Sequence, residues 1–211
     1  MRRVKPIDRR EFTIGVQWWF TNTRWPRDFH NADYESLAAQ NPDGAFLDDW
    51  WAGFLPRLTA WLALRPFSRA EVTALLVANR DDLAGAWHQA CGPVKDRDIT
   101  GVTWDQVRAF PEVVARLKPT SSPVFRSKFC HFLLPRVFPV FDNSAVGGSR
   151  TYERYFNLVK GTWEATSADL QASLVAELAQ LVENSGPKPL YAGFPMATKI
   201  TELALIGRKH A

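Results

Sequence analysis

Apolar residues recur every three or four positions along most of this chain, which is the spacing that lines one side of an α-helix. Pro56 stands inside the broadest of these stripes, where it can split the helix. The main members of that stripe are Phe46, Trp50, Phe54 and Leu58. A second stripe follows Ser167, which is placed to cap its helix. Its members are Leu170, Leu174, Leu178 and Leu181.

Capping residues, glycines and prolines mark where the helices begin and end. Ser68 with Glu71 forms a capping box, and Thr103 with Gln106 has the same spacing. Asn31 is expected to cap a helix that runs to about residue 40. The further helices are predicted near residues 81–91, 111–118, 124–134, 152–159 and 194–206, and the last is expected to stop at Gly207.

The segment 11–29 lacks this periodicity and is predicted to be a loop or a short extended piece. Its aromatic residues interleave with Arg24 and Arg27, an arrangement that suits base stacking beside phosphate contacts. Packing of the same aromatic rings onto the helical body is the simpler alternative. The rings concerned are Trp18, Trp19, Phe20 and Trp25.

The patterns together predict an all-α fold of roughly ten helices. A chain of 211 residues can bury a substantial core, as one large domain or as two small lobes. Hydrophobic residues make up 46% and charged residues 23%, which is typical of a folded soluble protein. Nine tryptophans and fourteen phenylalanines are an unusually large number. Filling of a helical core should explain most of them, and some rings are candidates for lining a cleft.

Cysteine usage and hydropathy exclude several classes of protein. Cys91 and Cys130 show no CxxC or Cys/His spacing, so we expect no disulfide framework, no metal centre and no cofactor. The start of the chain has no hydrophobic run, and no uncharged stretch is long enough to span a bilayer. These features predict a cytoplasmic monomer without a membrane partner.

The net charge of +4 is unevenly distributed along the chain. Residues 28–115 hold thirteen acidic side chains against seven basic ones, whereas residues 116–160 hold eight basic side chains against two acidic ones. A concentration of positive charge is typical of a surface that faces phosphates. A solvated basic surface without a partner would give the same count.

The basic region contains a lysine and an aspartate fourteen positions apart, Lys128 and Asp142. Lys128 lies one helical turn from Val124 and from Phe132, so we expect its ammonium to be buried. Burial lowers the pKa of an ammonium and makes a nucleophilic amine more accessible. Asp142 precedes Asn143 and is a candidate helix cap, a position that keeps a carboxylate ionised.

Structural roles would explain the same residues. Lys128 and Asp142 can form a buried ion pair without any chemistry. By the same reasoning His131 is a hydrogen-bonded core histidine, and Cys130 is a small apolar residue of the core.

The order of Ser127-Lys128 on a helix and then Phe138-Pro139-Val140-Phe141-Asp142-Asn143-Ser144-Ala145-Val146 resembles the helix-hairpin-helix (HhH-GPD) DNA glycosylases. In that superfamily a lysine begins the second hairpin helix of bifunctional members, and an essential aspartate follows a Pro-Val pair. The resemblance implies two helical lobes with DNA held in a central cleft. The lobes would comprise residues 30–118, and residues 1–29 with 119–211. The glycine-rich hairpin of the family is replaced here by the glycine-free segment 119–126.

By this resemblance the protein is a DNA glycosylase that flips a damaged or modified base out of double-stranded DNA and hydrolyses its N-glycosidic bond. Asp142 would stabilise the sugar cation or activate water, and Lys128 could form a Schiff base that permits strand cleavage. Repair of damaged DNA and defence against modified phage DNA are equally compatible with this activity. The implied phosphate contacts are Ser122, Arg126, Ser127, Arg136, Asn143, Ser144 and Arg150. The implied base pocket is Trp18, Trp19 and His131.

Two other functions fit the sequence. The first is a helical module that binds nucleic acid through the same basic surface without chemistry. The second is a helical protein-interaction domain in which Lys128 and Asp142 only stabilise the fold.

Overall fold

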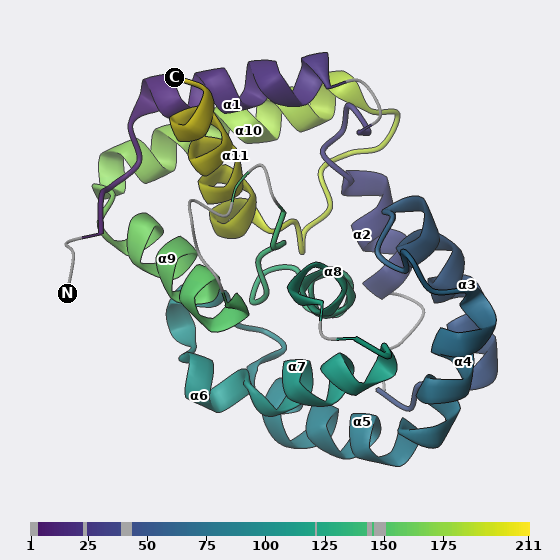
Figure 1. Cartoon of the computed structure of the whole chain (residues 1–211). Helices are drawn as coiled ribbons and strands as arrows, with labels where there is room; N and C mark the ends of the chain where they lie inside the picture. Colours follow the sequence, from purple (N-terminus) through teal and green to yellow (C-terminus); the bar gives the residue numbers. More distant parts are fainter. Residues whose placement is uncertain (1–3, 23–24, 39–43, 121, 143–144, 146–150) are drawn as a thin grey trace.

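The computed structural model describes residues 4–22, 25–38, 44–120, 122–142, 145 and 151–211. Within these ranges the chain forms eleven α-helices and no strand, which confirms the predicted all-α class. The helices surround α8 (Pro123–Leu133), seen close to end-on at the centre of Figure 1. Among the described helices, none has both the length and the apolar character needed to cross a bilayer.

The prediction of a loop over residues 11–29 is wrong for its first half, because α1 is a helix from Arg9 to Thr21. A capping box formed by Asp8 and Glu11 starts this helix ahead of the aromatic residues. Phe12, Val16 and Trp19 then form a buried helical stripe. The helical period was present, but the adjacent Trp18, Trp19 and Phe20 obscured it.

The last helix, α11 (Met196–His210), runs through Gly207 instead of stopping there. Gly207 lies where α11 crosses α1, and a Cβ atom on it would be 1.7 Å from the carbonyl oxygen of Glu11. A Cβ on Gly15 would likewise be 1.8 Å from the carbonyl oxygen of Leu203. The two glycines therefore allow the backbones of the first and last helices to touch, and Gly207 is a packing residue instead of a helix stop.

The prediction of Asn31 as a cap is wrong, because Asn31 is the first residue of its helix and its side chain bonds the backbone of Pro189 and Tyr191. The other predicted caps in the middle of the chain are observed. Both capping boxes, at Ser68 and at Thr103, are formed. The helices are α2 (Asn31–Ala38), α3 (Asp48–Ala60), α4 (Arg69–Ala78), α5 (Arg80–Ala86), α6 (Trp104–Val107) and α7 (Ala109–Val114). A π-helical turn (Trp87–Cys91) and short 3₁₀ turns (Gly92–Val94, Ile99–Gly101, Ala115–Leu117) connect them. The helix predicted from Asn31 to about residue 40 corresponds to α2, and its predicted last residues, 39–40, lie outside the described residues.

Pro56 does not split its helix, since α3 continues from Asp48 to Ala60 with the proline inside it. Phe54 and Leu58 flank the proline on the buried side, and both are completely buried. The packing of this side outweighs the single backbone hydrogen bond that a proline removes.

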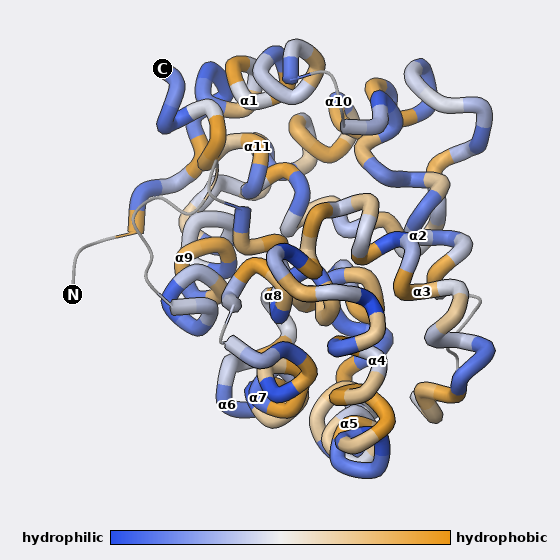
Figure 2. Tube along the Cα trace, turned by 45° about the vertical axis from the view of Figure 1, so that its right-hand side comes forward, coloured by the Kyte–Doolittle hydropathy of each residue, from blue (hydrophilic) through white to orange (hydrophobic). Residues whose placement is uncertain are grey.

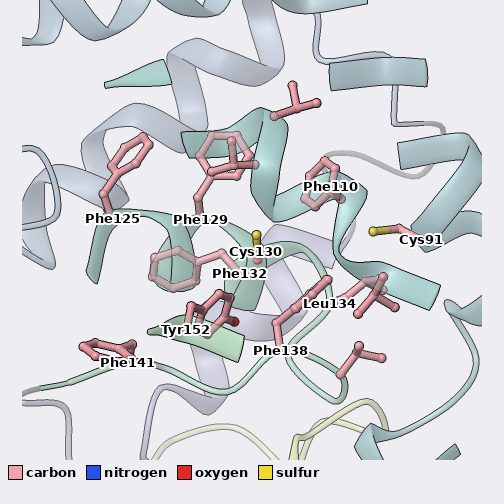
Figure 3. Close-up of a cluster of buried hydrophobic side chains, with 14 of the residues drawn as sticks. Cys91, Phe110, Phe125, Phe129, Cys130, Phe132, Leu134, Phe138, Phe141 and Tyr152 are labelled. Carbon is pink, nitrogen blue, oxygen red and sulfur yellow. The ribbon is translucent and has the colours of Figure 1, made fainter. Parts of the chain in front are cut away.

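The remaining helices are α9 (Tyr152–Glu164) and α10 (Ala168–Ser185), and most helices are amphipathic. Figure 2 shows hydrophobic and hydrophilic residues alternating around α4, α5 and α7. The buried side chains form two clusters. The first cluster runs from Leu37 to Val159 with Leu205 and Ile206, and it includes the phenylalanines of α8 shown in Figure 3. The second cluster comprises residues of 7–34 and 163–204.

Candidate functional site

A cavity of about 590 Å³ has walls drawn from both clusters. Trp19 and the segment Trp25–Asp33 contribute one wall, and Ala60–Leu62 contributes another. α8, the segment that follows it and α11 supply the rest. The lining residues with polar side chains besides tryptophan are His30, Asp33, Lys128, Asp142, Lys199 and Glu202. The structure thus brings Lys128 and Asp142, the two residues singled out in the sequence, to one cavity.

Asp142 is positioned by a segment that three side chains hold in place. His131 Nδ1 is 2.6 Å from the Phe138 carbonyl, and Tyr152 donates a hydrogen bond to the Pro139 carbonyl at 3.0 Å. Ser127 Oγ accepts a hydrogen bond from the Phe141 N–H at 2.9 Å. Asp142 follows directly and is half-buried. Contacts from α8 and α9 therefore fix the backbone that carries the carboxylate.

Lys128 is 9% exposed, and its Nζ donates a hydrogen bond to the Trp61 carbonyl at 2.6 Å. Burial lowers the pKa of Lys128, while the nearby charges of Asp142 and Glu202 act in the opposite direction. Trp61 is the C-terminal cap of α3, where a cation is favoured by the helix dipole. Lys128 is thus buried as expected, and it has a structural contact in addition to its place beside Asp142.

A second lysine and carboxylate, Lys199 and Glu202 on α11, complete the charged part of the cavity. Their side chains are 0% and 5% exposed and are 2.7 Å apart. Burial raises the pKa of Glu202, which Lys199 opposes. The Lys199 ammonium also lies 4.8 Å from the centre of the Trp19 ring. Sequence reasoning missed this pair, although opposite charges at i and i+3 in an otherwise apolar helix were a visible signal.

His30 and Asp33 line the same cavity and were also missed. His30 Nδ1 is 3.2 Å from Asp33 Oδ2, and Asp33 Oδ1 accepts a hydrogen bond from Arg57 at 2.5 Å. Burial lowers the pKa of His30 to about 4. The hydrogen bond with His30, followed by the charges of His30 and Arg57, lowers the pKa of Asp33 against the effect of burial. The histidine is therefore neutral at neutral pH beside an ionised carboxylate.

Three tryptophans give the cavity flat aromatic surfaces. The rings of Trp19 and Trp25 have centroids 4.3 Å apart, and Trp61 lies 4.0 Å from the His30 ring. Trp19 donates its Nε1–H to the Pro26 carbonyl at 3.0 Å, which fixes the ring. A planar ligand could stack against such surfaces.

Of the three predicted base-pocket residues, the structure brings only Trp19 to the cavity. Trp18 is half-buried, and its ring stacks on His210 with centroids 5.1 Å apart. His131 is 1% exposed and bonded to Tyr34 Oη at 2.7 Å as well as to the Phe138 carbonyl. That arrangement matches the alternative of a hydrogen-bonded core histidine.

The predicted phosphate contacts are divided between surface and interior. Arg126 and Arg136 are partly exposed, and Ser122 caps α8 by accepting a hydrogen bond from the Phe125 N–H at 3.2 Å. Ser127 is fully buried, so its hydroxyl positions the segment before Asp142 and does not face a phosphate. The other three, Asn143, Ser144 and Arg150, lie outside the described residues.

The basic region of residues 116–160 presents less charge to solvent than its composition suggests. Lys118 donates to the carbonyls of Ala63 and Arg65, and Lys160 donates to those of Thr100 and Val102. Lys128 makes the similar contact with Trp61. These three lysines bind backbone carbonyls, so among the described residues of the region the exposed positive charge comes mainly from Arg116, Arg126, Arg136 and Arg154.

Comparison of the chain with protein-family models, with curated proteins and with solved structures finds no match. The function must therefore be inferred from the cavity. It combines three carboxylates, two buried lysines, a neutral histidine and aromatic walls, which together suit a planar heterocycle and the chemistry of a bond beside it.

Proposed function

We propose that the protein is a DNA glycosylase related to the helix-hairpin-helix superfamily and that the cavity receives a base flipped out of double-stranded DNA. The observation that carries the proposal is the meeting of Asp142 and Lys128 in one cavity with Trp19, Trp25 and Trp61. A flipped base needs aromatic or apolar walls to stack on, and the sugar beside it needs a carboxylate. The position of the cavity between two core clusters supports a two-lobed arrangement with DNA across its mouth.

Asp142 acts first in the proposed reaction. As the bond between base and sugar breaks, positive charge develops on the sugar, and the carboxylate stabilises it or accepts a proton from the attacking water. The held backbone of residues 138–141 keeps the carboxylate at a fixed position, so little reorganisation is needed during the reaction.

Lys128 has two roles that the experiment separates. In a monofunctional enzyme it remains bonded to Trp61 and keeps a positive charge near Asp142. In a bifunctional enzyme the neutral amine leaves that carbonyl and attacks C1′ of the sugar as the base departs with the bonding electron pair and one amine proton. The C1′–O4′ bond then opens, the second amine proton passes to O4′, and a Schiff base results. Burial favours the neutral amine, whereas the two carboxylates favour the ammonium.

The test is base release from duplexes that carry a panel of damaged and modified bases, with and without borohydride. Asp142→Asn should abolish base release, a loss of at least about 100-fold, while DNA binding is retained. Lys128→Ala should remove any borohydride-trapped adduct. Lys118→Ala is the matched control, because Lys118 is also buried and also donates to backbone carbonyls.

Other outcomes would identify the alternatives. Salt-dependent DNA binding that is unchanged in Asp142→Asn, without release of any base, would indicate a binding module. Absence of salt-dependent binding would indicate a protein-interaction domain. If Lys118→Ala and Lys128→Ala lost stability equally and no adduct formed with either wild type or variants, Lys128 would be structural.

A further inference from the structure

His30 is a buried residue on the wall of the cavity that the proposed chemistry does not use. It has a left-handed backbone conformation with φ of 70°, and Phe29 before it has φ of 52°. Non-glycine residues in this conformation cost about 1–3 kcal/mol each and persist only where their surroundings fix them, often at ligand sites. The strain here turns the chain into α2 and brings the imidazole to the cavity.

The protonation of the ring follows from its partner. An ionised carboxylate can only accept a hydrogen bond, so the proton on the neutral ring is at Nδ1, facing Asp33 Oδ2 at 3.2 Å. Arg57 holds the other oxygen of Asp33 and keeps the carboxylate in place. Nε2 therefore carries a lone pair and is a hydrogen-bond acceptor.

The orientation of the ring is also fixed. It lies 4.0 Å from Trp61 and 5.6 Å from Trp19, measured between ring centroids. His30 is 6% exposed, and among the described residues Nδ1 has a side-chain hydrogen-bond partner while Nε2 has none. Nε2 is therefore the ring nitrogen left to accept a hydrogen bond from a ligand or water in the cavity.

We propose that His30 Nε2 accepts a hydrogen bond from an N–H group of a heteroaromatic base that stacks within the cavity. The site would then select bases that carry an amino or ring N–H donor on that edge. This inference rests on the proposed function in one respect, the assumption that the ligand is a base of a nucleic acid. The aromatic walls and the fixed acceptor are features of the cavity itself.

Burial and two nearby lysines keep His30 an acceptor at neutral pH. Asp33 of α2 favours the protonated ring, and Lys199 of α11 and Lys128 of α8 disfavour it. Burial is the largest influence, and the pKa of His30 is about 4 as a result. Protonation at lower pH turns Nε2 into a donor, so affinity for a base with an N–H donor should fall as the pH approaches 4.

The experiment uses free bases that differ by one amino group. The pairs are adenine with purine, and cytosine with pyrimidin-2-one. Binding is followed by tryptophan fluorescence and by the ¹⁵N resonance of His30 Nε2. We expect the amino-bearing member of at least one pair to bind at least about tenfold more tightly, equivalent to about 1.4 kcal/mol, and to shift the Nε2 resonance.

Two variants and one pH series test the role of the nitrogen. His30→Asn tolerates the left-handed backbone and supplies an amide oxygen. It should keep the preference at pH 7 and show a smaller fall in affinity near pH 4, because only protonation of the free base itself remains. His30→Phe keeps a planar ring without an acceptor and should bind both members of a pair equally. The wild-type pH series needs no substitution.

The inference would be overturned if the two members of each pair bound equally well. It would also be overturned if binding left the Nε2 resonance unchanged, or if neither pair bound at all. Failure of the proposed function has a different signature. A protein that prefers amino-bearing bases through His30 but releases no base from DNA would refute the glycosylase and leave the recognition site standing. Base release from DNA without any such preference would support the glycosylase and refute the recognition site at His30.

Discussion

Leu62 combines strain and exposure at the cavity. Its φ is 57°, its side chain is 53% exposed, and it is one of the lining residues. The neighbouring residues Trp61 and Ala63 are held by Lys128 and Lys118 through their carbonyls. Because the backbone on both sides of Leu62 is held, its apolar side chain could enter the space that a flipped base leaves in the DNA stack.

We therefore expect Leu62→Ala to lower base release at least about tenfold, because extruding a base costs a few kcal/mol that an inserted side chain offsets. Leu62→Gly should lower release similarly while raising stability by about 1 kcal/mol, since glycine adopts a positive φ without strain. Release kinetics and urea denaturation measure the two effects. Leu47→Ala is the control, because Leu47 is 60% exposed and is not a lining residue. Equal losses in both alanine variants would contradict this prediction.

The pair Lys199 and Glu202 makes a prediction about stability. Lys199→Met leaves a buried carboxylate without its partner and should cost about 3–5 kcal/mol in the free energy of unfolding. The double variant Lys199→Met with Glu202→Leu should recover most of that loss. Lys188→Met removes one partner of an exposed pair with Glu35 and should change stability by less than about 1 kcal/mol. Chemical denaturation measures the free energy of unfolding of each variant. Similar losses in Lys199→Met and Lys188→Met would contradict this prediction.

At the scale of elements, the crossing of α1 and α11 depends on two glycines. Gly207→Ala places a methyl group on the Glu11 carbonyl and should destabilise the protein by at least about 1–3 kcal/mol, the usual cost of overpacking. Gly85→Ala is the matched control, because a Cβ there meets no atom within 4 Å in helix α5. It should be neutral or stabilise by up to about 1 kcal/mol. Thermal melting of both variants measures the difference, and a neutral Gly207→Ala would refute the tight crossing.

The elements that could be predicted from the sequence are those with local signals. Helix starts are marked by Ser68, Thr103 and Ser122, whose side chains form hydrogen bonds with the residue three positions further along the chain. Gly207 shows where local reasoning fails, because the sequence cannot distinguish a glycine at a helix end from one at a close crossing. That distinction depends on Glu11, which is nearly 200 positions away.

The candidate site could be predicted only in part for the same reason. Asp142 and Lys128 belong to one short segment, so their proximity could be inferred from the chain between them. His30 reaches the cavity through an unusual backbone conformation, and Lys199 reaches it from the last helix. Neither residue has a local pattern that places it beside Asp142.

At the scale of the whole molecule, His30 and His131 are buried and neutral, and burial lowers the pKa of both. Below about pH 6.5 the unfolded chain takes up protons that the folded chain does not, so their contribution to stability is complete above that pH. It is lost as the pH falls through the folded pKa, which is about 4 for His30. Glu202 has a raised pKa and acts with the opposite sign, so its contribution falls as the pH rises above about 4.5.

A variant isolates the histidine contribution from that of Glu202. Between pH 7 and pH 4, the stability of wild type relative to His30→Asn should fall by about 3 kcal/mol, because burial lowers the pKa of His30 to about 4. His88→Asn replaces an exposed histidine and should show no such change. Urea denaturation at a series of pH values measures both. A pH-independent difference for His30→Asn would show that His30 is not buried as a neutral ring.

The pairing of α1 with α11 also has a consequence for synthesis. Roughly 175 residues separate Thr21 from Met196, and at about 5–20 residues per second a ribosome needs about 10–35 s to make them. During that interval Phe12, Val16 and Trp19 have no α11 to cover them. The nascent chain therefore carries these apolar side chains without their α11 partners for that interval, and the cavity can be completed only when α11 has left the ribosome.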